Sequence, residues 1–414
     1  MKTTNIGRTP LDKGPLEGIK VIDWTIWQFG PVATMMLGDM GAEIIKIESP
    51  DGDPGRGMGS MGRVASNLAG GRTAYFEGNN RNKKSITLDL RKPEAKEIVY
   101  KLVKDADVFV QNFRTGVADR QGLGYETLKK INPKIIYASG NGFGAEGPDA
   151  TRPAFDTAGQ ARAGMMFSAV PAGGDPRAVG GGVADQMGGI TLCQGILTAL
   201  VARSIHGVGQ KVDVSHLGSL IWLQGLAIST GLLNGRFTPP GDRTNAANPL
   251  SNSYRCKDDN WLQFVNLQSD RYWPTWCRLL GLERLVEDPK FSTLKARSDN
   301  ARELIIICDK AFATKTADEW EELIKKAGDL VYARVQRLSD LTSDPQVIAN
   351  EYITDVEHPV LGSIKLANHP VRFSETPTHI RSTAPELGEH TEDVLLGLGY
   401  TWEQIAELHE KGAI

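Results

Sequence analysis

Apolar and polar residues alternate with two different periods along the first half of the chain. Short runs rich in β-branched residues predict strands, and they cover residues 19–24, 42–48, 86–90, 107–111, 134–139 and 210–214. Helices are predicted from Pro31 to about Gly38, over residues 93–105, and from Asp185 to about His206. This β-α-β-α order predicts an α/β fold with a largely parallel sheet and helices on both faces. Ligands of such sheets bind at the carboxyl ends of the strands.

The pattern changes after residue 220. Prolines and glycines gather over residues 234–242 and again within 349–385, which is typical of connecting segments. Between them lie two strand-like runs and a helix start marked by a capping box from Thr316 to Glu319. We therefore expect a large domain over residues 1–220, a linker over 221–245, a smaller α+β domain over 246–348, a second linker over 349–385 and a C-terminal segment over 386–414.

Residues 49–84 are rich in Gly, Asn and Arg and are predicted to form a long functional loop. Within it, residues 57–62 fit the pattern G-x-G-x-x-G. A dinucleotide-binding fingerprint follows a strand directly and opens a helix. Here residues 49–54 separate the pattern from the strand, and no helical pattern follows. We interpret it as a mobile glycine loop near a site rather than a nicotinamide-cofactor site.

Composition excludes several classes of function. A net charge of -3 gives no electrostatic case for a nucleic-acid partner. The four cysteines are scattered without a C-x-x-C pair, which argues against disulfides and zinc and indicates a reducing compartment. The N-terminus carries no apolar signal region, and the apolar stretch near 190–205 is interrupted by polar residues, so we expect a cytoplasmic protein without a membrane span.

The seven histidines show no metal-ligand spacing, so neither a metal site nor a tightly bound cofactor is expected. His206 and His216 flank the strand at 210–214 and are assigned structural roles. The basic cluster Arg81–Lys84, with Arg91 and Lys92 after the next strand, suits either phosphate binding or a solvated surface. Residues 112–116 follow a strand directly, which is either a ligand-binding position or a simple loop.

Asp185 is the strongest candidate for chemistry. It follows three glycines, Gly180 to Gly182, at the start of a long apolar helix. Glycines let a backbone approach a ligand closely, and the helix dipole favours an ionised carboxylate there. Such a carboxylate can act as a nucleophile toward an activated acyl group. The alternative is that Asp185 is the N-cap of its helix, a role for which Asp is favoured.

Taken together, six segments in this order resemble the class III coenzyme A transferases, the CaiB–BaiF or formyl-CoA transferase family. They are residues 15–23 (PLEGIKVID), 41–48 (GAEIIKIE), 82–90 (NKKSITLDL), 106–114 (ADVFVQNFR), 207–214 (GVGQKVDV) and 387–395 (LGEHTEDVL). The resemblance covers nearly the whole chain. It implies a Rossmann-like large domain, a smaller second domain, a C-terminal segment that returns to the large domain, and an interlocked homodimer.

The resemblance also implies an activity and its residues. Asp185 falls at the position of the family's aspartyl nucleophile, which transfers coenzyme A between an acyl-CoA and a carboxylic acid through aspartyl anhydride and aspartyl-CoA intermediates. Coenzyme A is then a substrate and not a resident cofactor. The positions that match the family's thioester and coenzyme A site are Gln28, Phe29, Leu88, Arg91, Asn112, Phe113 and Arg120.

The chain departs from the family pattern at three places. Ser49 stands where oxalate-using relatives place an arginine, and their glycine-rich substrate loop has no clear counterpart near 235–250. Phe155 occupies the position of the histidine in the racemase branch, and phenylalanine cannot move a proton. Two alternatives remain open: a 2-methylacyl-CoA racemase of the same fold, and a non-catalytic CoA-binding subunit of a hetero-oligomer.

Overall fold

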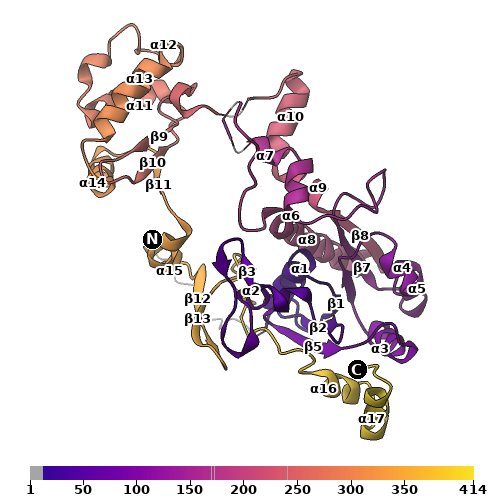
Figure 1. Ribbon diagram of the computed structural model, residues 1–414. Helices are drawn as coiled ribbons and strands as arrows, with labels where there is room; N and C mark the ends of the chain where they lie inside the picture. The colour runs from indigo at the N-terminus through magenta and orange to yellow at the C-terminus, as the bar shows by residue number, and fades with distance from the viewer. Residues whose placement is uncertain (1–12, 169, 172, 240) are drawn as a thin grey trace. The chain divides into compact units, whose positions relative to one another are not determined.

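A six-stranded, fully parallel sheet forms the centre of the larger part of the computed structural model (Figure 1). The structure describes residues 13–168, 170–171, 173–239 and 241–414. The strand order is β5-β2-β1-β6-β7-β8. The strands are β1 (Lys20–Trp24), β2 (Glu43–Glu48), β5 (Lys83–Thr87), β6 (Val108–Gln111), β7 (Ile136–Asn141) and β8 (Gln210–Ser215). The order reverses between β1 and β6, so the loops after these two strands border the crevice where ligands of such sheets bind.

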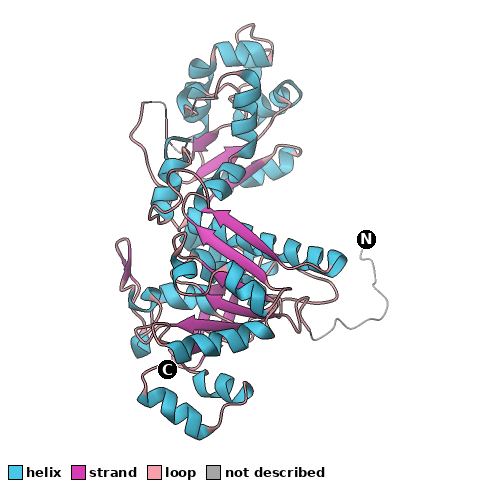
Figure 2. Cartoon of the chain, turned by 90° about the vertical axis from the view of Figure 1, so that its right-hand side faces the viewer, coloured by secondary structure: helices cyan, strands magenta, loops and turns pink. Residues whose placement is uncertain are grey.

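Helices cover both faces of this sheet (Figure 2). Val21 packs in one core with α1 (Phe29–Asp39) and α8 (Val183–His206). The next residue, Ile22, packs in the opposite core with α3 (Pro93–Lys104), α5 (Tyr125–Ile131), α16 (Thr391–Gly397) and α17 (Trp402–Glu410). Successive strand residues point to opposite faces, which explains why β1 and β6 at the centre of the sheet carry buried apolar residues on both faces.

Two glycines set the approach of α8 to α1. A Cβ on Gly188 would lie 2.8 Å from the ring of Phe29, and one on Gly189 would lie 2.7 Å from the side chain of Val32. Any larger residue would therefore push the helices apart, because interiors are close-packed. This contact places the second turn of α8 beside the first turn of α1.

The segment 49–84 was expected to be one long loop, and this is wrong. It contains α2 (Ala74–Asn80), capped by Thr73, whose side chain accepts a hydrogen bond from the N–H of Phe76. It also contains a small antiparallel pair, β3 (Ser60–Met61) and β4 (Val64–Ala65). The G-x-G-x-x-G pattern lies on this hairpin and on the turn before it. The following strand begins at Lys83 and not at residue 86, because the side chains of Lys83 and Ser85 are buried polar partners and disguise the apolar pattern.

The chain divides into two compact units. The larger unit comprises residues up to Met166, Arg177–Thr238 and Ile348–Ile414, and the smaller comprises Phe167–Pro176 and Pro239–Val347. The segment predicted as a first linker contains the end of α9 (His216–Leu223) and all of α10 (Gly225–Asn234). The segment predicted as a second linker contains an antiparallel hairpin of β12 (Ile353–His358) and β13 (Gly362–Ala367). The larger unit also contains α4 (Val117–Arg120) and α6 (Asp156–Arg162), and the boundary between the units falls within α7 (Met165–Ser168) and α15 (Pro345–Ala349).

The smaller unit is an α+β arrangement around an aromatic core. Its antiparallel sheet has the order β11-β10-β9, and its elements are β9 (Ser253–Arg255), β10 (Trp261–Phe264), α11 (Ser269–Leu280), α12 (Leu294–Asp299), α13 (Ala301–Phe312), α14 (Ala317–Ala327) and β11 (Tyr332–Val335). The capping box from Thr316 to Glu319 is confirmed at the start of α14. All four cysteines of the chain are free and buried.

The C-terminal segment is hydrogen-bonded to the edge strand of the large sheet. The N–H of Gly388 donates to Ser85 Oγ at 3.0 Å, and the N–H of Thr87 donates to Thr391 Oγ1 at 3.0 Å. Arg56 Nη2 donates to the carbonyl of Pro385 at 3.0 Å. These contacts place α16 against β5 at the end of the sheet.

One helix in the described part of the chain, α8, is long and apolar enough to cross a membrane by length and composition alone, and α9 with α10, bent by 72°, could count as a second span. The core helix of a soluble protein passes the same test. Here α8 packs along α1 and the large sheet.

Candidate active site

The loop after β1 is held across the switch point by a side chain from the loop after β6. Asn112 Nδ2 donates to the carbonyl of Ile26 at 2.7 Å, and the N–H of Ile26 donates to Asn112 Oδ1 at 2.9 Å. A side-chain amide that satisfies both backbone groups of one residue fixes its position as a neighbouring strand would. The conformation of residues 25–28 is thus set by the sheet and not by the loop alone.

Trp27 takes an unusual backbone conformation in this loop. Its φ is 65°, in the left-handed region that residues other than glycine seldom adopt. This backbone conformation costs about 1–3 kcal/mol. Its N–H donates to Asp53 Oδ1 at 3.2 Å. Asp53 is in turn fixed by a buried ion pair with Lys46 at 2.8 Å, and Lys46 Nζ also donates to the carbonyl of Thr25 at 2.7 Å. Asp53 and Lys46 therefore stabilise the strained conformation of Trp27.

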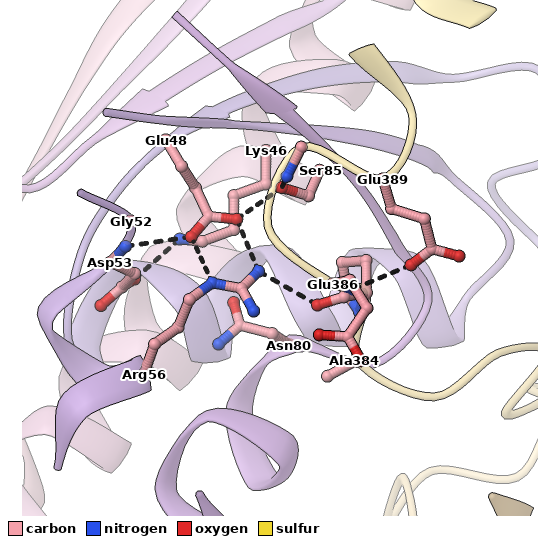
Figure 3. Close-up of polar contacts among 12 residues, drawn as sticks. Lys46, Glu48, Gly52, Asp53, Arg56, Asn80, Ser85, Ala384, Glu386 and Glu389 are labelled. Atoms are coloured by element: carbon pink, nitrogen blue, oxygen red, sulfur yellow. Dashed lines mark hydrogen bonds and ion pairs between the residues drawn. The ribbon is translucent and has the colours of Figure 1, made fainter. Parts of the chain in front are cut away.

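Asp53 also belongs to a charged network that includes Glu48, Arg56 and Ser85 of the edge strand β5 (Figure 3). Glu48 accepts hydrogen bonds from Arg56 Nε and Nη2, both at 2.8 Å, from Ser85 Oγ at 2.6 Å and from the N–H of Asp53 at 3.0 Å. Burial alone would raise the pKa of the Glu48 carboxyl, but hydrogen bonding and charge from Arg56, the charge of Lys46 and the hydrogen bond from Ser85 outweigh burial and lower its pKa. The network is fully paired, which is the condition for buried charge to be tolerated.

Asp185 is the third residue of α8 and is not its N-cap. The N-cap is Gly182, with a φ of 66°. The free N–H groups of the helix are instead capped by Asp156, the first residue of α6, whose Oδ2 accepts from the N–H of Ala184 at 2.6 Å and of Asp185 at 3.2 Å. Asp156 Oδ1 accepts from Gln160 Nε2 at 2.6 Å. Capping from another element leaves the side chain of Asp185 free for chemistry.

His216 is the polar partner of Asp185. Its Nε2 lies 2.8 Å from Asp185 Oδ1, and its ring packs on Phe29 with centroids 4.7 Å apart and planes at 33°. The sequence interpretation gave His216 a structural role and missed this contact. The available signal was its place directly after β8, at the carboxyl end of a parallel strand, where ligands of such sheets bind.

A cavity of about 500 Å³ opens in front of this pair. Its walls come from the loops after β1, β6 and β7 and from the start of α6, and they are mainly apolar. They include Ile26, Trp27, Phe29, Asn112, Phe113, Arg114, Val117, Arg152, Ala154, Phe155, Asp185 and His216. Trp27 and Phe155 both line the cavity and contact each other edge to face, with ring centroids 5.8 Å apart. The strands β1, β6, β7 and β8 are consecutive neighbours in the large sheet, and Figure 1 shows β7 and β8 side by side in it.

The structure brings together four of the eight residues predicted for the site. Phe29, Asn112, Phe113 and Asp185 line the cavity. Gln28 lies beside it, with Nε2 3.3 Å from Gln186 Oε1 on α8. Gly182 has a φ of 66°, which favours glycine, and a Cβ there would lie 2.5 Å from Gln28 Oε1 and would displace that side chain.

The other three predicted residues do not line this cavity. The side chain of Leu88 is 1% exposed and packs in the core, which leaves its backbone as the part that could meet a ligand. Arg91 is exposed and hydrogen-bonded to Asp89, and Arg120 lies exposed on α4. Within the nearby basic cluster, Arg81 pairs with Asp39 and is buried, so its part in phosphate binding is excluded by its structural ion pair.

The site has the parts for acyl transfer at a carboxylate. An aspartate at a helix start faces an apolar cavity, a histidine holds one of its oxygens, and backbone amides are exposed in the glycine run before α8. Within the described residues, no three His, Cys, Asp or Glu side chains lie where they could together hold a metal ion.

The chain is similar to known coenzyme A transferases in sequence and to a solved CAIB/BAIF family protein in structure. A model of CoA-transferase family III matches residues 16–391. The chain is 36% identical to an acyl-CoA transferase of Fusarium pseudograminearum, over 97% of this chain and 89% of the relative. It is 34% identical to a cinnamoyl-CoA:phenyllactate CoA-transferase of Clostridium sporogenes, over 95% of each. A crystal structure of a CAIB/BAIF family protein from Brucella suis matches with a TM-score of 0.83 at 30% identity, covering 93% of this chain and 100% of that one.

The chain belongs to CoA-transferase family III, and it is an enzyme of that class. The resemblance read from its six sequence segments is confirmed.

Proposed function

We propose that the protein transfers coenzyme A from an acyl-CoA to a carboxylic acid through covalent intermediates on Asp185. The observation that carries the proposal is the position of this carboxylate. It lies in the first turn of α8, it faces the cavity, and a neighbouring helix supplies the cap that it would otherwise provide. An ionised, positioned carboxylate is a competent nucleophile toward a thioester.

The steps balance without any other reactant. A carboxylate oxygen of Asp185 attacks the thioester carbon, and the carbon–sulfur bond breaks. Coenzyme A departs as its thiolate, and an aspartyl–acyl anhydride remains on the enzyme. The thiolate then attacks Cγ of Asp185 and the donor acid departs as its carboxylate. The acceptor carboxylate displaces the thiolate from this aspartyl-CoA, and the thiolate finally attacks the acceptor carbonyl and restores Asp185. The carbonyl stays activated throughout because water is excluded by apolar walls.

The cavity suits acids larger than oxalate. Trp27 and Phe155 form an aromatic wall, and an aromatic or branched acyl group would bury apolar surface against it. Ser49 carries no charge for a second carboxylate. We expect the wild type to favour such acids in a panel that crosses formyl-, acetyl-, succinyl- and cinnamoyl-CoA with oxalate, succinate and phenyllactate. Oxalate with formyl-CoA as the best pair would contradict this part of the proposal.

The coenzyme A site is proposed at the edge of this cavity. Asn112 and Phe113 lie at the switch point, where the backbone of an extended ligand would cross the sheet. Arg120 and Arg91 are exposed cations that could meet its phosphates. Gln28 and Phe29 border the thioester position beside Asp185, and Leu88 would contribute backbone only.

The decisive test is substitution of the nucleophile. Asp185→Asn and Asp185→Ala are expected to fold as the wild type does and to lose at least about 10³-fold in kcat. Hydroxylamine added during turnover should convert Asp185 of the wild type to its hydroxamate, seen as a mass increase on that peptide. Asp318→Asn is the matched control, since Asp318 also lies in the first turn of a helix but is exposed. Full activity of Asp185→Ala would disprove the mechanism.

A further inference from the structure

We propose that His216 is a second catalytic residue, which stabilises the negative charge that develops on Asp185 when its own carbonyl is attacked. The inference rests on the covalent mechanism above. It starts from the 2.8 Å contact between His216 Nε2 and Asp185 Oδ1. Within the residues that the structure describes, Asp185 Oδ2 receives no hydrogen bond, so the two oxygens differ in environment.

The environment of the ring decides which nitrogen carries the proton. His216 Nδ1 is buried and has no hydrogen-bond partner in the described part of the chain. A proton on Nδ1 would leave an unpaired buried N–H, which costs about 1–3 kcal/mol. The ring also lies against Phe29 and is only 4% exposed. The proton therefore belongs on Nε2, and His216 donates to Asp185.

The role of this donor differs between steps. In the first step the charge develops on the carbonyl oxygen of the substrate, away from His216. In the second and third steps the thiolate and then the acceptor carboxylate attack Cγ of Asp185, and the charge develops on the oxygen that Asp185 keeps. A donor 2.8 Å from that oxygen is at the distance of an effective oxyanion contact. His216 thus accelerates the steps at Asp185 and leaves the first step without its help.

Donation also has a ground-state effect with the opposite sign. A hydrogen bond to the free carboxylate makes it a weaker nucleophile. Loss of the donor should therefore leave the first attack as fast as before or faster, while release of the donor acid slows. This separation would not follow from a purely structural histidine.

The experiment measures donor-acid release in the absence of an acceptor. The enzyme is mixed by quench flow with the acyl-CoA from the panel that gives the wild type its fastest turnover, labelled with carbon-14 in the acyl group. The wild type should release a burst of about one equivalent of free acid per active site. His216→Met removes the donor, and His216→Gln keeps an N–H donor in a side chain of similar size.

The rate of the burst should be about 100-fold or more lower in His216→Met than in the wild type. In His216→Gln it should be at least about tenfold higher than in His216→Met. The KM for acyl-CoA should change little, and the unreleased label should be found on the Asp185 peptide. His206→Met, at the exposed end of α8, is the matched control and should behave as the wild type. His216→Phe, which keeps a ring against Phe29, replaces His216→Met if the latter does not fold.

A burst in His216→Met or His216→Phe at the wild-type rate, or a His216→Gln burst no faster than that of the variant without a donor, would overturn the role of His216. Failure of the covalent mechanism would look different. The wild type itself would then release no acid without an acceptor and show no adduct on Asp185.

Discussion

At the residue scale, the proposed nucleophile and the N-terminal cap of α8 are two different carboxylates, Asp185 and Asp156. Asp156 caps α8 with one carboxylate oxygen and holds Gln160 with the other. Both oxygens of this carboxylate are therefore engaged by hydrogen-bond donors of the chain itself. Phe155, which stands where the racemase branch has histidine, has no titratable group. Neither residue offers the second base that racemisation requires.

We therefore expect no racemisation. With a chiral 2-methylacyl-CoA in heavy water, the α-hydrogen should exchange far more slowly than coenzyme A is transferred, as followed by mass spectrometry. Phe155→His is the informative comparison, because it restores a titratable group in the cavity beside Trp27. Exchange by the wild type at the rate of coenzyme A transfer would favour the racemase alternative.

At the element scale, the contact between α1 and α8 positions the site. Gly189→Ala should lower the free energy of unfolding by about 1–3 kcal/mol, because its Cβ would lie 2.7 Å from the side chain of Val32 and 3.0 Å from the carbonyl of Phe29. Gly78→Ala in α2 is the control. Nothing lies within 4 Å of a Cβ there, so the better helix propensity of alanine should stabilise the protein by about 0.5–1 kcal/mol. Urea unfolding measures both, and equal effects would contradict this account.

The network around Glu48 should make stability depend on pH. Because the folded state lowers the pKa of Glu48, the stabilisation is complete above its unfolded pKa of about 4.5 and is lost as the pH falls through the folded value. Glu48→Gln should cost about 3 kcal/mol at pH 7, and its difference from the wild type should shrink below pH 4.5. Urea unfolding at several pH values measures this. Glu322→Gln, on an exposed pair, should show no such trend.

At the scale of the whole molecule, a large apolar surface is left uncovered by the single chain. The helices α9 and α10 and the residues after them expose five large side chains by 63–87%, namely Trp222, Leu226, Leu232, Leu233 and Phe237. Large apolar side chains exposed together on two consecutive helices are typical of a protein–protein interface. We propose that a second copy covers it in the interlocked homodimer that the family resemblance implies.

The expected mass by light scattering is twice the 45.0 kDa of one chain at all workable dilutions. Trp222→Glu with Leu226→Glu should weaken the dimer, since two charges would be buried in an apolar interface. Glu substitutions at Lys295 and Lys325, exposed in the smaller unit, are the matched control. An active monomer would contradict the proposal.

The sequence by itself determined most of the architecture and the identity of the nucleophile candidate. Five of the six strands of the large sheet follow from local apolar runs, and the capping box at Thr316 follows from two side chains three residues apart. Such signals are local, so they can be read without knowing the fold. Composition gave wrong predictions for α2 and β5, which are short and polar and are stabilised by residues distant in the sequence. It also predicted a linker where α10 forms, because glycines lie within that helix.

Only the tertiary structure decided how Asp185 is surrounded. His216 is 31 residues away along the chain, and the capping carboxylate of Asp156 is 29 residues away. The strained turn at Trp27 is fixed by Asp53, which is held by Lys46 from another strand. These contacts depend on which strands become neighbours in the sheet, and pairing between distant segments leaves no periodic trace in the sequence. The sequence therefore located the proposed nucleophile, while the fold supplied the residues that contact it.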